Sequence, residues 1–340
     1  MKKGFSAIVF ALLLATLTCA AQAQSTPPAG NFRFQNIDVP GAQSTFVGGI
    51  NNLGQVVGFF RDASNGVHGY FQDEAGADIR EITFPNARKT FPAAINNAGT
   101  IAGSYSDGTR FHGFVLEHGA FINIDFPGAT LTTIVDLNDR GDVVGVYEDA
   151  AFGLHGFILD KNGFASVDDP AQTSQTPSTQ AFGINDRKTV NGLFLDVNGN
   201  SHGFALSQGV FQTIDVPGAT STAPSGLNDS DAMVGFYIGA DNVQHGYVQH
   251  GAQFTTLDFP GVGTTFPFQI SDPGTIVGLF IDDQGVTHSF LADPLTVVNQ
   301  DGNGNNFAPA INQTPTQSCT QSNRTVDPEQ IRNRTACSTD

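Results

Sequence analysis

Six histidines recur at a nearly constant spacing, and histidine is the side chain best suited to bind a metal ion or to move a proton at neutral pH. They are His68, His112, His155, His202, His245 and His288, 43 to 47 residues apart, and each begins a His-Gly-aromatic tripeptide or, in the sixth copy, His-Ser-Phe. A period of this length is typical of a propeller or a solenoid. Equivalent residues of successive copies lie far apart in such folds. We therefore expect each histidine to fix its own turn through hydrogen bonds rather than to share one metal.

Aspartates form the second recurring group. Asp38, Asp125, Asp168, Asp215 and Asp258 each precede a proline within two residues. Such carboxylates organise turns by accepting hydrogen bonds from nearby backbone N–H groups. The functional alternative is that they form an acidic, ligand-binding rim on one face, together with the loop acids Asp62, Asp107, Asp149, Asp196 and Asp282.

Two oxygen-rich stretches are candidate calcium sites. The candidate ligands are Asp196, Asn198 and Asn200 in one stretch, and Asp301, Asn303 and Asn305 in the other. Neither continues into a complete EF-hand loop, which ends in a glutamate. The sequence therefore predicts no cofactor, with calcium as the alternative.

Catalytic motifs do not stand out. The sequence contains no Gly-x-Ser-x-Gly elbow, no His-Glu-x-x-His and no phosphate-binding glycine-rich loop, so no catalytic residue is assigned. The formal net charge of −17 argues against a nucleic-acid partner, because nucleic-acid binding needs the opposite sign.

The repeated unit predicts four short strands and no helix. In the fifth copy, strand D covers residues 211–217, strand A 226–229, strand B 232–237 and strand C 245–248. Short strands separated by turns predict four-stranded antiparallel blades. Asn162–Gly163 is a typical type I′ hairpin sequence. A glycine recurs in every strand B, which indicates close approach of another backbone; these are Gly58, Gly103, Gly145, Gly192, Gly235 and Gly278.

The two ends of the repeat array predict closure. The array begins with a lone strand D at residues 32–39 and ends with a strand C at residues 288–291. Pairing of these two strands would complete a sixth blade and remove the open sheet edges. The predicted fold is an all-β, six-bladed propeller over residues 32–294, and a β-solenoid is the alternative.

The segments outside the array have their own signatures. Residues 1–23 read as a signal peptide, and residues 24–31 form a short linker. Residues 295–340 are polar and are predicted to be mostly irregular, with a disulfide between Cys319 and Cys337. We expect an exported monomer without a membrane span, either secreted or periplasmic.

Two copies depart from the consensus. The second has Thr83 in place of the aspartate and adds Arg80, Arg88 and Lys89, which makes this copy basic within an acidic ring. The fourth has an expanded loop at residues 170–180. Loops carry function more often than strands do, so these departures are candidate functional positions; neutral drift is the alternative explanation for both.

The chain resembles the extracellular repeat family that is named for its His-Ala-Phe tripeptide. Gly49-Ile50-Asn51-Asn52, Gly54-Gln55-Val56-Val57-Gly58 and His68-Gly69-Tyr70 carry the resemblance, which extends over residues 32–293. The resemblance implies an exported repeat protein and supplies no catalytic residues.

Two functions remain open on the sequence. The first is a non-catalytic binding or adhesion scaffold for glycans or cell-surface proteins. The second is a polysaccharide-acting hydrolase or lyase with its site at the axial mouth of the propeller.

Overall fold

The computed structural model describes residues 32–174, 176–295, 299–300 and 306–307. The predicted signal peptide, the linker, the ligands at residues 301–305 and the cysteine pair lie outside these residues. The described chain is built of β-strands, and no helix in it is long and apolar enough to cross a membrane. It divides into a unit that ends at Leu295 and a second unit from Thr296 onward, where β25 (Asn299–Gln300) pairs with β26 (Asn306–Phe307).

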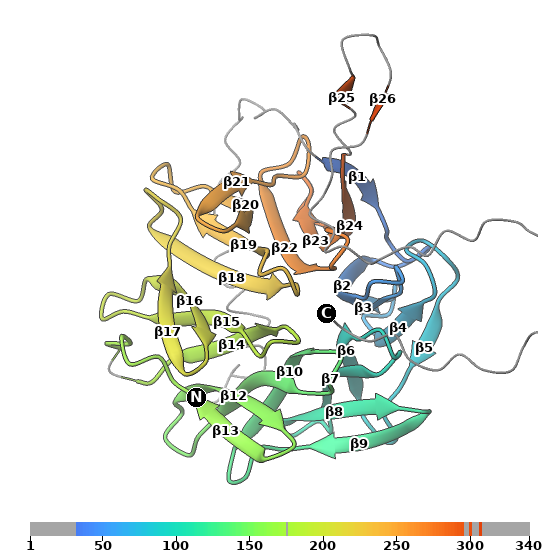
Figure 1. The fold of residues 1–340 in the computed structure, drawn as a ribbon. Coiled ribbons are helices and arrows are strands. Elements are labelled where there is room, and N and C mark those ends of the chain that lie inside the picture. Colours follow the sequence, from blue (N-terminus) through green and yellow to red (C-terminus); the bar gives the residue numbers. More distant parts are fainter. Residues whose placement is uncertain (1–31, 175, 296–298, 301–305, 308–340) are drawn as a thin grey trace, which may run out of the picture. The chain divides into compact units, whose positions relative to one another are not determined.

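Six four-stranded antiparallel sheets follow one another around a ring and confirm the predicted six-bladed β-propeller (Figure 1). Blade 1 is β2 (Ser44–Ile50), β3 (Val56–Arg61), β4 (Val67–Gln72) and β5 (Arg80–Ile82); blade 2 is β6 (Lys89–Ile95), β7 (Ile101–Ser106), β8 (Phe111–Glu117) and β9 (Ala120–Ile124); blade 3 is β10 (Leu131–Leu137), β11 (Val143–Glu148), β12 (Leu154–Asp160) and β13 (Gly163–Val167). Blade 4 is β14 (Thr179–Ile184), β15 (Val190–Leu195), β16 (Ser201–Ser207) and β17 (Val210–Ile214); blade 5 is β18 (Ser221–Leu227), β19 (Met233–Ile238), β20 (Gln244–His250) and β21 (Gln253–Thr256); blade 6 is β22 (Thr264–Ile270), β23 (Ile276–Ile281), β24 (Thr287–Pro294) and β1 (Phe32–Asn36). Within each blade, strands A to D run outward from the axis in this order.

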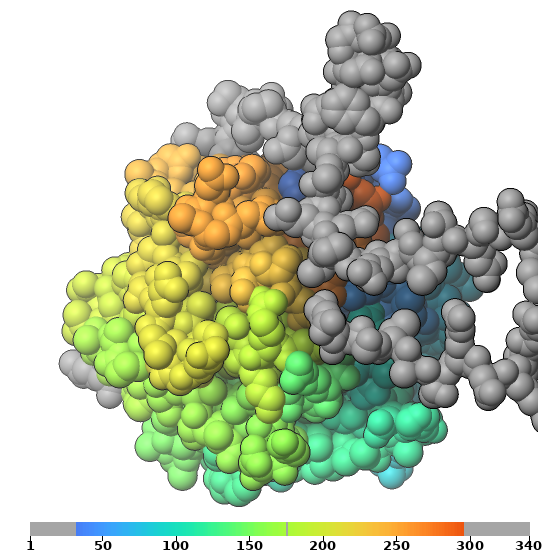
Figure 2. Space-filling view, viewed as in Figure 1, coloured from blue at the N-terminus to red at the C-terminus, as the bar shows by residue number. Residues whose placement is uncertain are grey.

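Blade 6 closes the ring with strands from both ends of the array. β1 pairs antiparallel with β24, and the register places Phe32 opposite Pro294 and Asn36 opposite Phe290. The N–H of Ile37 extends the pairing by donating to the carbonyl of Ser289 at 2.9 Å. Figure 2 shows the colours following the chain around the ring until blue meets orange-red.

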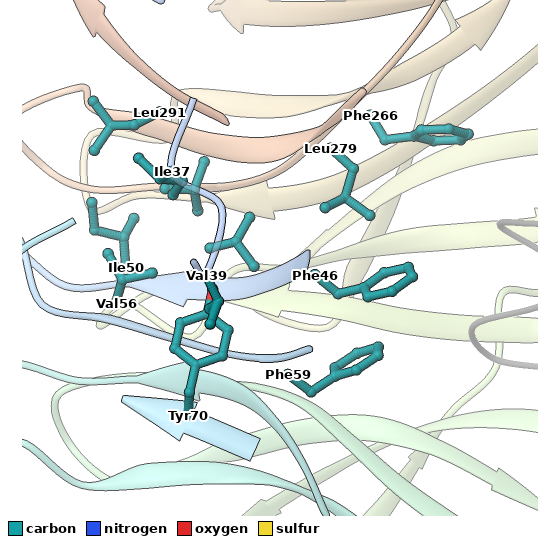
Figure 3. Packing of buried hydrophobic residues seen from close by; sticks show 12 residues of the cluster. Ile37, Val39, Phe46, Ile50, Val56, Phe59, Tyr70, Phe266, Leu279 and Leu291 are labelled. Atoms are coloured by element: carbon teal, nitrogen blue, oxygen red, sulfur yellow. The ribbon is translucent and has the colours of Figure 1, made fainter. Parts of the chain in front are cut away.

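Apolar side chains on both faces of each blade hold neighbouring blades together. In the largest cluster, Ile37 and Leu291 of blade 6 meet Val56 and Tyr70 of blade 1, all buried (Figure 3). The six aromatic residues at the equivalent of Tyr70 are completely buried: Tyr70, Phe114, Phe157, Phe204, Tyr247 and Phe290. Because each blade covers its neighbour, the hydrophobic core is a ring of contacts between sheets.

A buried threonine at the start of strand A fixes every connection from strand D. Its hydroxyl accepts a hydrogen bond from a backbone N–H of the connecting loop, as Thr45 does from Val39 at 3.0 Å. The other five bonds join Thr90 to Phe84, Thr132 to Phe126, Thr179 to Asp169, Thr222 to Val216 and Thr265 to Phe259. The loop between blades therefore has a similar anchor in all six copies.

The glycines of strand B are sites of close backbone approach, as predicted. Strand A of every blade contains a bulge, which lies between Ile134 and Asp136 in blade 3. A Cβ at Gly145 would overlap the carbonyl oxygen of Thr133 in the neighbouring strand. Only glycine leaves room for that carbonyl.

The outer hairpins correct one expectation about turn type. Both turn residues have positive φ at His118–Gly119 and Gln208–Gly209, which is type I′ geometry. At Asn162–Gly163 only the glycine has positive φ, so the predicted type I′ turn is wrong. The N–H of Asn162 instead donates to Asp160 at 2.7 Å, and that local bond favours a different turn.

Replacing Gly145 with alanine tests the packing of strand A on strand B. We expect Gly145→Ala to lower the free energy of unfolding by about 3 kcal/mol or more, because the added methyl group overlaps backbone that cannot move aside. The matched control is Gly263→Ala, where a Cβ meets nothing within 4 Å and φ is not positive. Denaturant unfolding measures both variants, and equal stabilities would contradict this account of the glycines.

Candidate functional site

One face of the propeller carries the D-to-A and B-to-C connections, and all six recurring histidines lie there; we call it the histidine face. Each histidine ring stacks on an aromatic side chain of the adjacent strand B, as His112 does on Tyr105 with ring centroids 4.9 Å apart. The other pairs are His68 on Phe60, His155 on Tyr147, His202 on Phe194, His245 on Tyr237 and His288 on Phe280. The six rings occupy six separate blades, so they do not converge on one ion.

Two carboxylates hold each ring in place. In blade 3, Nδ1 of His155 lies 2.7 Å from Asp168 and Nε2 lies 3.3 Å from Asp149. The arrangement recurs as Asp107–His112–Asp125, Asp196–His202–Asp215, Asp241–His245–Asp258 and Asp282–His288–Asp38. This bridge joins the B-to-C loop to the end of strand D, and it confirms the structural interpretation of the histidines.

The loop aspartate of each bridge also shapes its own turn. In blade 3, one oxygen of Asp149 accepts hydrogen bonds from the N–H groups of Ala151 and Gly153, and the other oxygen faces His155. These bonds, with that of Gly153 the largest, hold the pKa of the Asp149 carboxyl below its ordinary value. The carboxylate is therefore held ionised and oriented by its own loop and histidine.

The predicted ligand-face aspartates lie on the histidine face, but each one points at the histidine of its own blade. Asp38 reaches the bridge across 250 positions of sequence and lies 2.6 Å from His288, which adds a polar bond to ring closure. Its second oxygen accepts the N–H of Ser289 at 2.9 Å. In blade 1, where Thr83 replaces the aspartate, Glu81 supplies the carboxylate 3.2 Å from Nδ1 of His68.

The first candidate calcium stretch forms a turn. The side-chain amides of Asn198 and Asn200 present their nitrogens to Asp196, at 3.4 and 3.0 Å. Asp196 also accepts the backbone N–H groups of both residues. Throughout the part of the chain that the structure describes, no group of three His, Cys, Asp or Glu side chains could hold a metal ion.

The opposite face, which carries the A-to-B turns, contains a closed ring of six hydrogen bonds that sequence reasoning did not predict. One polar residue from each A-to-B turn accepts the backbone N–H of its equivalent in the neighbouring blade. The donors and acceptors run Asn52 to Asn97, Asn97 to Asp139, Asp139 to Asp186, Asp186 to Asp229, Asp229 to Asp272 and Asp272 to Asn52, at 2.7 to 3.0 Å. Every blade thereby takes part in one cycle.

A second, buried set of bonds lies beneath this ring. The side-chain amide of Asn51 donates to the carbonyl of Asn96 in the next blade at 3.0 Å. The same bond joins Asn96 to Asn138, Asn138 to Asn185, Asn185 to Asn228 and Asn228 to Ser271. Serine replaces asparagine in blade 6, so this set has five members.

A strut crosses the axis between blades 3 and 6. The side-chain amide of Gln269 donates to Oδ1 of Asp136 at 2.9 Å, across 133 positions of sequence. Asp136 also accepts the N–H groups of Ile184 and Leu137, both at 2.9 Å, and only 2% of the residue is exposed. Burial raises the pKa of the Asp136 carboxyl to about 7, although these three donors favour the charged form.

The sequence gives only weak evidence for the contact between Gln269 and Asp136. The equivalent positions of the other four blades are Gly49, Ala94, Gly183 and Gly226. Two long polar side chains among small residues mark the exception, but a sequence does not show that blades 3 and 6 face each other across an axis.

The axial mouth on the turn face is a polar cavity of about 70 Å³, lined by the two sets of turn residues and by the strut. Pockets for small molecules usually measure about 300–1,000 Å³. Asp186 lines this cavity, and burial and the neighbouring Asp229 raise the pKa of its carboxyl. The cavity has room for ordered water but not for a sugar ring.

Comparisons of the sequence found no match among family models and none among curated proteins. Solved structures do match. TolB from Acinetobacter baumannii has a TM-score of 0.54 at 13% identity, over 71% of this chain and 64% of that one. SapL1 lectin, in a complex with alpha methyl fucoside, has a TM-score of 0.51 at 12% identity, over 74% and 93%. A six-bladed fungal lectin from Aleuria aurantia has a TM-score of 0.46 at 7% identity, over 76% and 93%. At these identities the likeness to TolB and to SapL1 lectin shows the fold alone.

The Asp258–His245 contact gives a prediction about pH. The hydrogen bond that the ring of His245 donates to the Asp258 carboxylate, partly opposed by burial, raises the pKa of His245. The bridge therefore adds stability that is complete below the unfolded value of 6.5 and is lost as pH rises through the raised folded pKa. Asp258→Asn should lower the pKa of His245 toward 6.5, as measured by NMR titration of the ring. The exposed Asp283→Asn is the control, and an unchanged His245 in Asp258→Asn would refute the account.

The strut gives a second prediction. The folded pKa of Asp136, about 7, lies above its unfolded value of 3.8, so the folded state keeps a proton that the unfolded state has released. The free energy of unfolding should then fall between pH 4 and 7, by up to about 4 kcal/mol. Asp136→Asn carries no such proton and should remove that part of the fall in denaturant titrations. Asp139→Asn, on the turn that follows β10, should keep it. Parallel pH profiles for Asp136→Asn and wild type would contradict the proposed burial effect.

Proposed function

We propose that the protein is an exported, non-catalytic scaffold that binds glycans through its histidine face. The observation that carries the proposal is the sixfold repetition, on one face, of loop pairs held by the histidine bridges. The fold that the chain shares with SapL1 lectin, which was solved with alpha methyl fucoside, supports the same reading. We also propose that the chain is a member of the His-Ala-Phe repeat family, on the motifs given above.

Rigid loops favour binding because little conformational entropy is lost when a ligand docks. In each blade the bridge ties the B-to-C loop to the D-to-A connection, and the buried threonine fixes that connection from below. Copies of one surface around a ring can also engage several sugars of a single glycan, which raises the overall affinity without any new contact. A site in each blade can then be weak on its own while the whole ring still binds a glycan tightly.

The hydrolase or lyase alternative is favoured by the raised pKa values of two acids at the axial mouth, Asp136 and Asp186. Glycosidases use two carboxyl groups that flank the bond to be cleaved. Asp136 is buried and bonded to three donors, and the cavity beside it is smaller than a sugar ring. The geometry therefore supports binding better than catalysis.

A glycan array combined with a hydrolysis and lyase screen tests the proposal on the purified protein. We expect retention of at least one glycan class, with no release of reducing ends and no new unsaturated product from any bound glycan. The positive control for the screen is a commercial glycosidase on the same substrates. Turnover that Asp136→Asn abolishes would overturn the binding proposal in favour of the enzyme, and an array without any binding would remove glycans as the ligand class.

A further inference from the structure

The histidine face differs in charge between blades 1 and 2 and the rest of the ring. β3 of blade 1 ends there at Arg61, and β6 of blade 2 begins there at Lys89, directly after Arg88. β3 and β6 pack against each other, which places these strand ends in neighbouring positions. Arg110 follows in the B-to-C loop of blade 2. We call these four residues the basic sector.

The backbone at Arg88 and Lys89 is the same as at the equivalent positions of other blades, so only the side chains differ. The N–H of Arg88 donates to the carbonyl of Ser106, as the N–H of Gln43 does to Arg61 and that of Thr130 to Glu148, all at 2.8 Å. Arg88–Lys89 therefore stands where the other blades have uncharged pairs. These pairs are Gln43–Ser44, Thr130–Leu131, Pro177–Ser178, Thr220–Ser221 and Gly263–Thr264.

Three of the four cations are available to a ligand. Within the described chain, Arg61, Arg88 and Lys89 form no ion pair, and Arg88 and Lys89 are exposed. Arg110 lies 3.6 Å from Asp125. Elsewhere, Arg33 pairs with Asp293, Arg80 with Asp73 and Arg187 with Asp231. Arg140 and Lys161 are exposed and, within the described chain, also form no ion pair, but they lie on the turn face and come from single positions of blade 3.

The position of Arg88 is set by the loop beside it. The side chain of Arg88 packs against Gly108 in the B-to-C loop, in space that any larger residue there would fill. A Cβ added to Gly108 would lie 2.7 Å from both Cδ and Nε of Arg88. Contact with this loop restricts the side chain and orients the guanidinium before a ligand arrives. A guanidinium held in this way suits bidentate binding of a carboxylate or a sulfate group.

The acids near the basic sector are already occupied. Asp62 faces His68 and the hydroxyl of Ser64, and Asp107 accepts from Thr109 and lies 3.4 Å from His112. The hydrogen bonds, led by those from Ser64 and Thr109, lower the pKa of both carboxyls. Both acids therefore stay ionised, and each is held by its own loop and histidine, with no ion pair to Arg88 or Lys89 in the described chain.

We propose that the basic sector binds the acidic group of a glycan, either the carboxylate of a uronic acid or a sulfate ester. The inference rests on the proposed glycan-binding function and names the class of glycan. The overall charge of −17 does not prevent such binding, because screening limits each charge to a range of about 8 Å at physiological salt. Within the described chain, Arg61, Arg88 and Lys89 have no ion-pair partner, so an anion that docks there meets unpaired positive charge at short range.

Calorimetric titration with two matched pairs of probes tests the proposal on the full protein. The first pair is a galacturonic acid oligomer and its methyl ester, and the second is a sulfated galactan oligomer and its desulfated form. We expect only an acidic member to bind, with an affinity that weakens as salt is raised from about 0.05 M to about 0.5 M. The acidic probe that binds identifies the source of the anion.

Two double variants locate the site. Arg88→Ala with Lys89→Ala should weaken binding of the acidic probe by about tenfold or more, because two charge-assisted contacts are lost. The control, Arg140→Ala with Lys161→Ala, removes two exposed cations from the turn face and should change the affinity by less than about twofold. Thermal unfolding of both variants verifies that they fold.

The outcomes separate this inference from the proposed function. Equal loss of affinity in both double variants would overturn the assignment of the site, as would equal binding of the acidic and neutral members of each pair. Binding of neutral glycans alone on the array would leave the scaffold proposal intact and refute the basic sector as a glycan site. An array without any binding would refute both.

Discussion

A blade that is apolar on both faces is stable only between two neighbours, and the rest of the structure depends on this constraint. In a linear array the first and last sheets would each expose a hydrophobic face, which must be capped or removed by closing the ring; this chain closes. Closure is achieved by β1 beside β24, by the buried cluster around Ile37, and by Asp38 at His288. These contacts join positions about 250 residues apart, and they resemble the contacts that complete every other blade.

Most of the polar side chains of the repeat maintain the ring. On the histidine face, carboxylates and imidazoles hold loops together, and on the turn face, asparagines and aspartates link one blade to the next. Few of these groups remain available for chemistry, even though histidine and aspartate are the residues of many active sites. Binding then falls to the surface of the loops and to positions where one blade differs from the others.

Periodicity predicted what is common to all blades, because repeated residues must meet similar surroundings. The blade count, the order of strands, the closure through residues 32–39 and the role of the strand B glycines all followed from it. Features that occur once could not be predicted in this way. Glu81 replaces the missing aspartate from two positions away, and the Asp136–Gln269 contact depends on which blades lie opposite each other. A repeat alignment reports the unusual residue but not its partner.

The ring of backbone-to-side-chain bonds on the turn face runs in one rotational sense, since each blade receives from one neighbour and donates to the other. Each turn therefore supplies one backbone donor and one side-chain acceptor, so in this ring of bonds no blade is first or last. Circular permutation should be tolerated at any loop between blades, because a chain opened elsewhere and joined through its present ends would rebuild the same set of contacts. The order in which the blades are encoded is thus a property of the gene, while the assembled ring has no starting point.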